Sequence, residues 1–365
     1  MIKVKDIAKI IEDFAPLSLQ ESYDNAGLLV GDSQMEVTGV LITVDVIEAV
    51  IDEAIEKNCN LIVAHHPLIF SGLKRLTGQN YIQKCVIKAI KNDIAIYSAH
   101  TNLDNVYLGV NGWLADKLEL NNKEILLPKK DILSKLITYV PKNHVENVKK
   151  AIFDAGAGKI GNYDCCSFDV EGEGSFRANN DATPFVGEVG ERHIETEIRV
   201  ETIVPNYEVQ KVVSAMLKAH PYEEPAFDIV PIKNSWSRVG AGMVGELTEE
   251  VKASDFLQQL KEKLSLKTIR YTGNLNKEIK KVALCGGSGS EFLKNAIHHQ
   301  ADIYISGDFK YHQFFDAEDR IIIADIGHFE SEVHTKQIFY ELISKKIPTF
   351  AVKIADSNTN PINYL

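Results

Sequence analysis

Short runs of apolar residues alternate with amphipathic stretches from Lys3 to Leu118. An apolar run of about four to eight residues is typical of a strand that is buried on both faces, in a sheet covered by helices. The sequence therefore predicts an α/β domain. The expected helices are Lys3–Phe14, Ile47–Lys57, Tyr81–Asn92 and Val106–Leu118, and the expected strands are Val37–Asp45, Asn60–Ala64 and Ile94–Ala99.

The pattern changes between Leu133 and Ile232. Strands such as Glu195–Val204 are longer there and alternate polar with apolar residues, and helices are expected at Asn143–Ala155 and Tyr207–His220. The segment Gly172–Gly187 between the two β-rich pieces is rich in Gly, Asn and Pro, which predicts a loop or ribbon. A βαβ unit that occurs twice predicts a small antiparallel sheet with helices on one face.

The first pattern returns after Val239–Gly242. The expected helices are Asp255–Leu264, Glu291–His299 and Glu332–Lys345, and the expected strands are Lys281–Cys285, Ile303–Ser306 and Arg320–Asp325. The simplest account is one α/β domain interrupted by a compact α+β insert. The expected boundaries are residues 1–130 for the first part of the α/β domain, 131–240 for the insert and 241–365 for the second part.

Composition limits the partners and the setting of the chain. The net charge of -11 argues against a broad face for nucleic acid, which needs clustered Lys and Arg. No apolar run is long enough to span a membrane, and charged residues stand where a signal peptide needs an apolar stretch, so we expect a cytoplasmic protein without membrane contact. The five cysteines are scattered and form no Cys-x-x-Cys, which fits a reducing compartment and argues against cysteine-ligated zinc.

Potential metal ligands stand after three of the expected strands. His65 and His66 follow one strand, Asp104 follows the next along the chain, and His328 and Glu332 follow a third. Catalytic sites for one or two divalent metals use imidazole and carboxylate ligands of this kind. Because the carboxyl ends of parallel strands lie along one edge of a sheet, these side chains can converge there. The sequence therefore predicts a metal centre at this edge.

The spacing within these groups supports that prediction. Adjacent side chains on extended backbone point to opposite sides, so His65 and His66 could reach two metals, although neighbouring histidines also suit a polar loop. His328 and Glu332 are four residues apart and share one face if a helix begins near Phe329. Asp104 supplies a carboxylate that could bridge two ions.

Three further residues are candidates for catalysis. His312 follows another strand end and could transfer protons, with an exposed helix histidine as the alternative. His100 could orient a metal ligand, or be a hydrogen-bonded core residue. Asp24 either lines the site or serves only the turn before Gly27. The loop Cys285–Ser290 lacks the signature of a P-loop, so we interpret it as a tight strand-to-helix turn rather than a phosphate cradle.

Five motifs give the chain a resemblance to a known family. They are Ser22–Gly31, Ala64–Pro67, Ala99–Asp104, Ala301–Asp308 and Gly327–Glu332. In this order and over nearly the whole chain, they look like the Nif3 family, whose members are also labelled GTP cyclohydrolase 1 type 2 homologs. The middle segment resembles the PII-like (ferredoxin-like) insert of longer bacterial members, through Gly172–Arg177 and His220–Pro225. Tyr23 and Asp308 depart from the residues that many relatives carry, Trp and Glu, and both changes are conservative.

The resemblance implies a site, an assembly and an activity. It implies two divalent ions per chain, Zn, Fe, Mn or Ni, with His65, His66, Asp104, His328 and Glu332 as ligands. It also implies a toroidal homohexamer. The family label implies a metal-dependent hydrolase in which metal-activated water attacks a nucleotide or a related substrate. The alternative is a metal-binding oligomeric adaptor or regulatory protein whose insert binds a partner or effector.

Overall fold

The computed structural model describes all residues from Met1 to Leu365 and divides into two compact units. The larger unit combines Met1–Pro128 with Arg238–Leu365, and the smaller unit is Lys129–Ser237. The smaller unit is called the insert below, because the chain enters it from the larger unit and returns to the larger unit. None of the helices is both long and apolar enough to cross a membrane.

The first sheet of the larger unit has five strands in the order β1-β4-β3-β2-β15. They are β1 (Gly27–Val30), β2 (Val40–Thr43), β3 (Leu61–Ala64), β4 (Ala95–Ser98) and β15 (Val352–Ile354). All neighbours run parallel except β1, which is antiparallel to β4. Every residue of the three central strands is buried, which explains why these strands are continuous apolar runs in the sequence.

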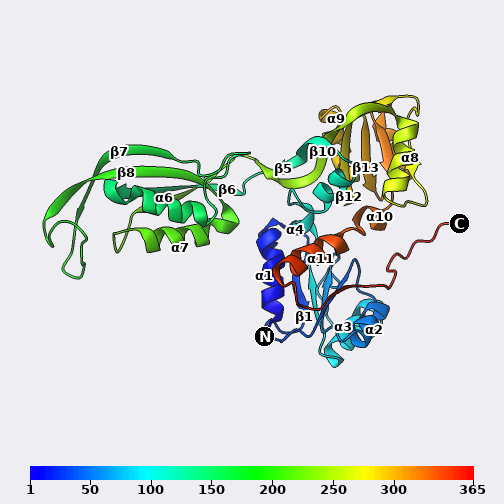
Figure 1. The fold of residues 1–365 in the computed structure, drawn as a ribbon, viewed down its shortest axis with the longest axis horizontal. Coiled ribbons are helices and arrows are strands. Elements are labelled where there is room, and N and C mark those ends of the chain that lie inside the picture. The colour runs from blue at the N-terminus through cyan, green and yellow to red at the C-terminus, as the bar shows by residue number, and fades with distance from the viewer. The chain divides into compact units, whose positions relative to one another are not determined.

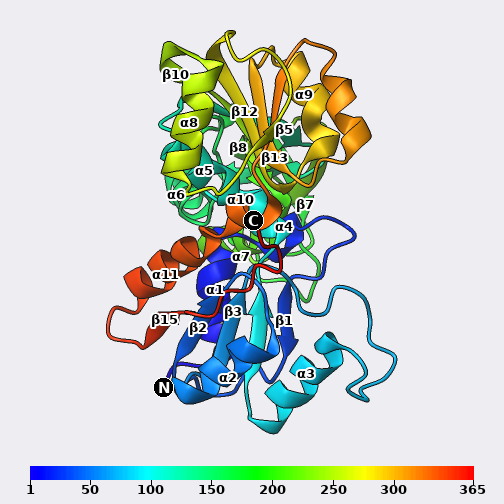
Figure 2. The same ribbon diagram turned by 90° about the vertical axis from the view of Figure 1, so that its right-hand side faces the viewer.

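Helices cover both faces of this sheet, as Figures 1 and 2 show. The helices α2 (Glu48–Glu56) and α3 (Tyr81–Lys91) pack on one face, where Val50, Ile51 and Val86 join Leu41 and Ile62 in one apolar cluster. On the other face lie α1 (Val4–Phe14) and α11 (Thr335–Lys346), which contact each other. The helix α1 buries Val4, Ile7 and Ile11, whose spacing is that of one helical face.

The second sheet of the larger unit has six strands in the order β11-β14-β13-β12-β10-β5. They are β5 (Asn121–Lys129), β10 (Trp236–Lys252), β11 (Arg270–Tyr271), β12 (Glu278–Ser288), β13 (Ile303–Gly307) and β14 (Ile322–Asp325). The strands β12, β13 and β14 are parallel, so their carboxyl ends share one edge. The accompanying helices are α5 (Val110–Lys117), α8 (Ala253–Lys263) and α9 (Leu293–His298), with 3-10 turns η4 (Ser290–Phe292) and η5 (Tyr311–Ala317).

Two very short helices follow strand ends and connect the sheets to the site. The helix α4 (Thr101–Asp104) follows β4, and α10 (His328–Glu332) follows β14. Figures 1 and 2 show α10 between the two sheets of the larger unit. It contacts β12 and β13, and its side chains reach His66 at the end of β3. The carboxyl ends of strands from both sheets therefore meet at α10.

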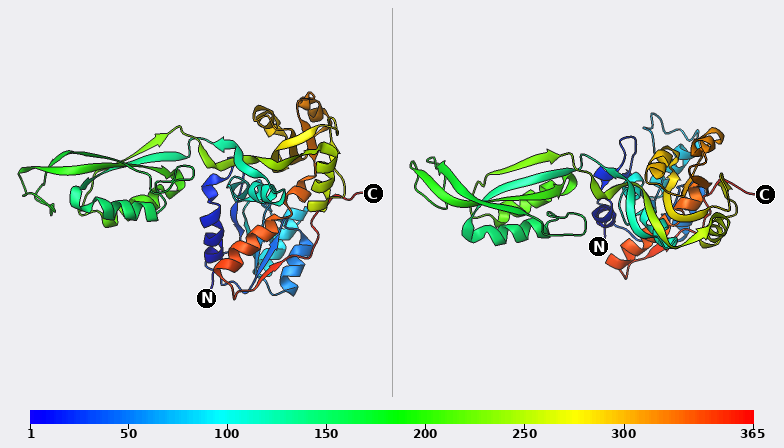
Figure 3. Two further views of the ribbon diagram at one scale, coloured as in Figure 1. Left: turned by 45° about the horizontal axis from the view of Figure 1, so that its top comes forward. Right: turned by 90° about the horizontal axis from the view of Figure 1, so that it is seen from above.

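The insert is a four-stranded antiparallel sheet in the order β7-β8-β6-β9, with two helices on one face (Figure 3). Its elements are β6 (Leu133–Pro141), α6 (Val145–Asp154), β7 (Phe168–Arg177), β8 (Arg192–Pro205), α7 (Val209–Ala219) and β9 (Phe227–Ile232), with turns η2 (Lys142–His144) and η3 (Asn206–Glu208). The order β-α-β-β-α-β is that of ferredoxin-like folds. A relationship to PII proteins stays a prediction.

Two expected helices differ from the structure. The helix expected at Val106–Leu118 begins only at Val110, because Val106 forms a bridge to Val239 and the backbone N–H of Tyr107 bonds the carbonyl of Arg238. The helix expected at Glu332–Lys345 is two helices, α10 and α11, separated by a turn at residues 333–334. The sequence analysis also missed the strands β5 and β10 and the short strands β1, β11 and β15; the runs of the short ones are too brief to give a periodic pattern.

The C-terminal segment is fixed to the larger unit by the buried Glu53 of α2. Its carboxylate accepts hydrogen bonds from the backbone N–H groups of Asp356 and Ser357 at 2.7 and 2.9 Å and pairs with Lys57 at 2.5 Å. Burial would raise the pKa of Glu53, but these hydrogen bonds outweigh it and lower the pKa to about 2. The carboxylate therefore holds the segment in place as an anion.

We expect Glu53→Gln to release this segment and to lower the free energy of unfolding by about 2 kcal/mol, the scale of hydrogen bonds to a charged group. Because the pKa of Glu53 is lowered from 4.5, its contribution is present above pH 4.5 and disappears as the pH falls towards 2. Denaturant unfolding at several pH values measures the difference. Glu56→Gln on the exposed side of the same helix is the control. Equal stability of the two variants at pH 7 would contradict the assignment.

Candidate metal centre

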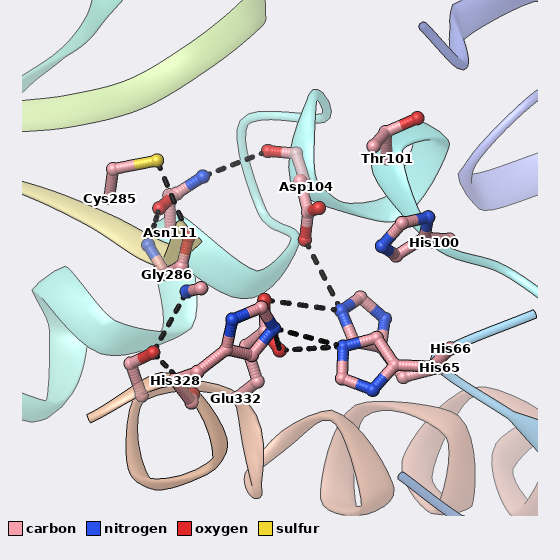
Figure 4. Close-up of polar contacts among 12 residues, drawn as sticks. His65, His66, His100, Thr101, Asp104, Asn111, Cys285, Gly286, His328 and Glu332 are labelled. Atoms are coloured by element: carbon pink, nitrogen blue, oxygen red, sulfur yellow. Dashed lines mark hydrogen bonds and ion pairs between the residues drawn. The ribbon is translucent and has the colours of Figure 1, made fainter. Parts of the chain in front are cut away.

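The five expected ligands come together from both sheets of the larger unit. His65 and His66 directly follow β3, the central strand of the first sheet, and Asp104 ends α4 after the neighbouring strand β4. His328 and Glu332 are the first and last residues of α10, after β14 of the second sheet. Figure 4 shows these side chains pointing toward one another. The strand-end pattern of the sequence thus corresponds to one cluster in space.

The potential ligand atoms form three overlapping groups, of which one is His65, His66 and His100 and the other two share Glu332. Of the two that share Glu332, His65, Asp104 and Glu332 make the first group, and His66, His328 and Glu332 make the second. In the first group, His65 Nε2 lies 3.7 Å from Asp104 Oδ1 and 3.6 Å from Glu332 Oε1. In the second, Glu332 Oε2 lies 2.9 Å from His66 Nε2 and 3.0 Å from His328 Nε2, and the two imidazole nitrogens are 3.2 Å apart.

These separations fit ligands of a common ion. With metal–ligand bonds of about 2.1 Å, neighbouring ligand atoms lie about 3.0 Å apart around an octahedral ion and about 3.4 Å apart around a tetrahedral one. The distances in both groups, from 2.9 to 3.7 Å, are close to this range. The cluster therefore has the spacing needed to hold metal ions.

Burial provides an independent test of this fit. His65 Nε2 and Asp104 Oδ1 are buried and have no hydrogen-bond partner. Such atoms are costly to bury unless something satisfies them, and a cation bound between them would do so. Glu332 belongs to both groups, with one oxygen in each. A bridging role for Asp104 stays a prediction.

Each of the three histidine rings is oriented by an oxygen atom at Nδ1. His65 Nδ1 lies 2.9 Å from the carbonyl of Ala99, which accepts a hydrogen bond from it. His66 Nδ1 lies 2.7 Å from Asp45 Oδ1, and His328 Nδ1 lies 2.7 Å from Asp308 Oδ2. A hydrogen bond at Nδ1 leaves the lone pair on Nε2 for a metal and fixes the ring. All three Nε2 atoms face the cluster.

The raised pKa values of His66, His328 and Asp104 indicate that the metal-free cluster holds protons on groups that a metal would bind. Burial would lower the pKa of His66, but hydrogen bonds to Asp45 and Glu332 outweigh it and raise the pKa to about 10. His328 behaves in the same way through Glu332, and its pKa rises to about 9. Burial and the nearby Glu332 charge raise the pKa of Asp104, so this carboxyl holds a proton more tightly than usual.

His100 and Asp24, two of the expected catalytic residues, form a pair beside the cluster. The His100 ring centre is 5.3 Å from that of His65 and 5.5 Å from that of His66. His100 Nδ1 lies 2.8 Å from Asp24 Oδ1, and Thr101 donates to the same carboxylate. Burial would raise the pKa of Asp24, but these contacts outweigh it and lower the pKa to about 2. The carboxylate therefore orients His100 from the side away from the cluster.

The third expected catalytic residue lies elsewhere. His312 is exposed on η5, and its ring contacts Tyr311 and Phe315 rather than the cluster. As its position after β13 predicted, His312 lies at the carboxyl edge of the second sheet. The 3-10 turn, however, directs its side chain outward. The contacts of His312 thus support the exposed-helix alternative, and the structure gives no support for proton transfer by it.

Most of the glycine-rich segment after Cys285 is strand rather than the turn that the sequence predicted. The strand β12 continues to Ser288, so the loop is the end of a strand that closes on the cluster. A Cβ atom at Gly287 would lie 2.1 Å from Glu332 Oε1, which requires glycine there. The backbone N–H groups of Gly286 and Gly287 already bond Asn111 and Ser331, so they are not available to a phosphate.

Two residues that support the cluster were missed in the sequence. Asp45 follows β2, so the rule of polar residues after strand ends would have found it. Asp45 Oδ2 accepts a hydrogen bond of 2.7 Å from Thr359 in the C-terminal segment. No local signal in the sequence shows that Thr359 lies beside the cluster. The segment anchored by Glu53 therefore also positions the carboxylate that orients His66.

The fold and the cluster define a class: an α/β protein in which two sheets meet at histidine and carboxylate groups able to hold metal ions. The chain belongs to the Duf34/NIF3 (NGG1p interacting factor 3) family, which it matches over residues 2–361. This membership confirms the family and the α/β fold class expected from the sequence.

Similar proteins match along the whole chain. A GTP cyclohydrolase 1 type 2 homolog of Bacillus subtilis (strain 168) is 40% identical over 366 residues, which cover 99% of this chain and 98% of that protein. The crystal structure of a Bacillus cereus protein related to NIF3 has a TM-score of 0.88 at 38% identity, over 100% of this chain and 99% of the other. Staphylococcus aureus protein SA1388 has a TM-score of 0.77 at 32% identity, with the same coverage.

The raised pKa values predict how metal affinity depends on pH. At pH 7 the metal-free cluster keeps protons on His66 and His328, whose pKa values are about 10 and 9, so a metal must displace them. We therefore expect the apparent affinity to rise with pH, about tenfold per unit for each proton displaced, and to level off above about pH 9 to 10.

Titration calorimetry in buffers of different ionisation enthalpy measures this release. We expect about two or more protons per chain at pH 7. An affinity that is constant between about pH 6 and 9 would contradict the proton-loaded cluster.

Proposed function

We propose that this protein is a dinuclear metal-dependent hydrolase, in which His65, Asp104 and Glu332 hold one ion and His66, His328 and Glu332 hold the other. The proposal rests on the number of protein side chains that can bind each metal ion. Each group offers three, and catalytic sites keep a coordination position for water or substrate where structural sites fill all positions with protein ligands. Zn, Fe, Mn and Ni all accept such mixed ligands.

The accessibility of the side chains supports a catalytic rather than a structural site. The side chains of His65 and Glu332 are 0% and 3% exposed, so they form the closed base of the cluster. Those of Asp104, His66 and His328 are 22%, 23% and 32% exposed. Water and substrate can therefore reach the cluster from the side of these three residues. A site that served only to hold the fold together would have no need of this opening.

The residues of the chain have separable roles in this proposal. Divalent ions at such a site lower the pKa of water toward neutrality and polarise the bond to be cleaved. Glu332 holds the two ligand groups at a fixed spacing. His100 stands beside the cluster with Nδ1 fixed by Asp24, so its Nε2 can accept a proton from water or return it to a leaving group. Asp24 is a positioning residue for His100.

Two aromatic rings next to the cluster support a substrate with a planar ring, such as a purine nucleotide. Phe70 contacts His100 with ring centres 6.3 Å apart, and Tyr23 contacts Phe70 at the same distance. Tyr23 is 62% exposed and Phe70 is 47% exposed, so both present ring surface to solvent beside a catalytic site. Exposed aromatic rings in such a place can stack on a base. The substrate ring would then lie over Tyr23 and Phe70, with the bond to be cleaved at the cluster.

We expect Tyr23→Ala to weaken binding of a purine nucleotide about tenfold or more, because stacking of a base on an aromatic side chain contributes on the order of 1–3 kcal/mol. Tyr23→Phe keeps the ring and should bind nearly as tightly as the wild type. Titration calorimetry of metal-loaded protein with GMP measures both. Equal affinity of the wild type and Tyr23→Ala would refute the stacking role while leaving the hydrolase proposal open.

A second candidate function is a metal-binding adaptor or regulatory protein without catalysis. It is favoured by the insert, which extends from Lys129 to Ser237 but contributes no residue to either ligand group. In this case the metal centre would stabilise the larger unit, and the insert would bind a partner or effector. The two candidates differ in one observable, which is turnover by the metal-loaded protein.

The proposed setting is a toroidal homohexamer in the cytoplasm. Tyr311 and Phe315 on η5 are 72% and 65% exposed and contact each other, and exposed apolar groups of this kind often mark a contact between subunits. All five cysteines are unpaired, as in a reducing compartment. Light scattering on the metal-loaded protein decides the assembly, since any mass other than six chains would refute the hexamer.

Metal content and turnover, measured together, test the proposed function. We expect about two divalent ions per reconstituted wild-type chain, and fewer in Glu332→Gln, which loses the carboxylate shared by both groups. Wild-type protein should hydrolyse at least one member of a panel of nucleotides and phosphoesters. Asp24→Asn should keep its metals but lose about 10–100-fold in kcat, as for other groups that orient a functional residue.

Elemental analysis and product chromatography give the two readouts. Two ions without turnover across the panel would favour the adaptor. No metal in the wild type after reconstitution would refute both candidates.

A further inference from the structure

The insert contains a cavity of about 620 Å³ that is separate in chain and chemistry from the metal centre. All of its lining residues lie between Tyr139 and Ala226, within the insert. Its size is in the range of sites for small organic ligands. The proposed hydrolase reaction does not use this cavity, so the role of the cavity must be explained separately.

The floor of the cavity is the face of the sheet that the helices do not cover. Leu136, Val140 and Val200 join the core with α6 and α7, and side chains alternate along a strand. The opposite face of β8 therefore presents Glu197 and Arg199, which line the cavity together with residues 170–179 of β7 and the chain beyond it. Residues 182–185 and 222–226, from two loops, complete the lining.

Two glycines on β7 leave space in this floor. Gly172 pairs with Glu197 across the strands, and a Cβ atom added at Gly172 would have nothing within 4 Å. A Cβ atom at Gly174 would lie 2.1 Å from Glu197 Oε2, so the carboxylate of Glu197 lies across the bare backbone of Gly174. Glycine is unfavourable in a strand, and it often marks a place where another group approaches the backbone closely. At Gly174 the missing side chain leaves room for the carboxylate of Glu197, and at Gly172 it leaves open volume.

Three aromatic rings form a wall of the cavity. Tyr222 lies between Phe176 and Phe185, with ring centres 6.2 Å apart in both pairs. The rings are tilted by 58° and 50° to one another rather than parallel. A flat heterocycle stacks best between parallel rings, whereas tilted rings present several faces to a compact group. Compact cations such as ammonium groups bind to aromatic faces in this way.

The charge of the lining agrees with a cationic ligand. Glu171 and Arg199 line the cavity, but each has an ion-pair partner outside it, Lys142 and Glu201 respectively, at 2.8 Å. Glu173 and Arg177 alternate with Gly172, Gly174 and Phe176 along β7 and therefore point to the face of the helices. The remaining lining groups without an ion pair are the carboxylates of Glu197, Glu223 and Glu224. This leaves a surplus of three negative charges around the cavity. An anion such as a phosphate would be repelled, and an ammonium group would be attracted.

The hydroxyl of Tyr222 provides a further, independent observation. Its oxygen is buried and has no hydrogen-bond partner within 3.5 Å, although most buried hydroxyls find one. Burial and interaction with the nearby Glu197 carboxylate raise the pKa of Tyr222, so the hydroxyl and this carboxylate lie on the same side of the cavity. The oxygen can accept a hydrogen bond from an N–H group of a ligand. We propose that the cavity of the insert binds small organic ammonium ions, with Phe176, Phe185 and Tyr222 around the cation and Glu197 as its counter-ion. This ligand site is independent of the metal centre.

Binding of choline and spermidine to the full-length protein tests the proposal. We expect saturable binding of at least one of them by calorimetry at about 0.15 M salt, where loose attraction to an acidic surface is screened. The neutral isostere of choline, 3,3-dimethylbutan-1-ol, should bind at least about tenfold more weakly, because it lacks the charge. Failure of both amines to bind would overturn the proposal, and so would equal affinity for choline and its isostere.

Substitutions in the floor locate the site. Gly172 does not have a positive φ angle, so Gly172→Leu is compatible with the strand and places a side chain in the open volume. We expect this variant to stay folded and to lose at least about tenfold in affinity. Gly72→Leu, at a position in the larger unit that is equally open, is the matched control and should bind like the wild type. Unchanged binding by folded Gly172→Leu would place the amine elsewhere and overturn the assignment.

A second pair of variants tests the counter-ion. Glu197→Gln keeps the shape of the side chain and removes its charge, and we expect about tenfold weaker binding, the scale of a hydrogen bond to a charged group. Glu146→Gln is the matched control, because the Glu146 side chain is 88% exposed and lies outside the cavity. Equal losses in the two variants would show attraction by net charge alone and would contradict a defined site.

Discussion

The larger unit depends on one buried carboxylate. Glu332 is held between His66 and His328 through one oxygen and faces His65 through the other, and its side chain is almost fully buried. A buried charge is tolerated only with charged or hydrogen-bonding partners. Burial would raise the pKa of Glu332, but the surrounding histidines outweigh this effect and hold the pKa well below its usual value. Because the histidines come from the first sheet and from α10, the carboxylate can be satisfied only when both sheets are in place.

The same requirement explains why the surroundings of the cluster are so strongly constrained. Asp45 orients His66 and is itself bonded by Thr359, so a segment near the C-terminus contributes to a site built from residues 65 to 332. Gly287 has no side chain because Glu332 occupies the adjacent space. Metal-free protein compensates the buried carboxylate with protons on His66 and His328, and a metal would replace these protons. Folding, proton binding and metal binding therefore involve one set of atoms.

The sequence predicts the parts of this site that follow from strand ends. His65, Asp104 and His328 each come after a buried strand, and the rule for parallel sheets places such residues along one edge. It does not predict which carboxylate is shared, because that depends on how α10 is directed by contacts with β12 and β13. Nor does it predict that His312 faces outward, since a 3-10 turn and a helix place a side chain differently after the same strand. Contacts such as Thr359 with Asp45 join residues far apart in the chain and leave no local pattern.

Glycine has opposite roles in the two candidate sites of this protein. At Gly287 the missing side chain is replaced by a protein carboxylate, so the space is already filled and the residue serves the geometry of a fixed cluster. At Gly172 the missing side chain leaves open volume next to Glu197, between aromatic rings and unpaired carboxylates. A strand gains nothing in stability from such an opening, because glycine there costs backbone entropy and packs against nothing. The metal centre is thus explained by contacts within the chain, whereas the cavity of the insert is best explained by a group that the chain itself does not supply.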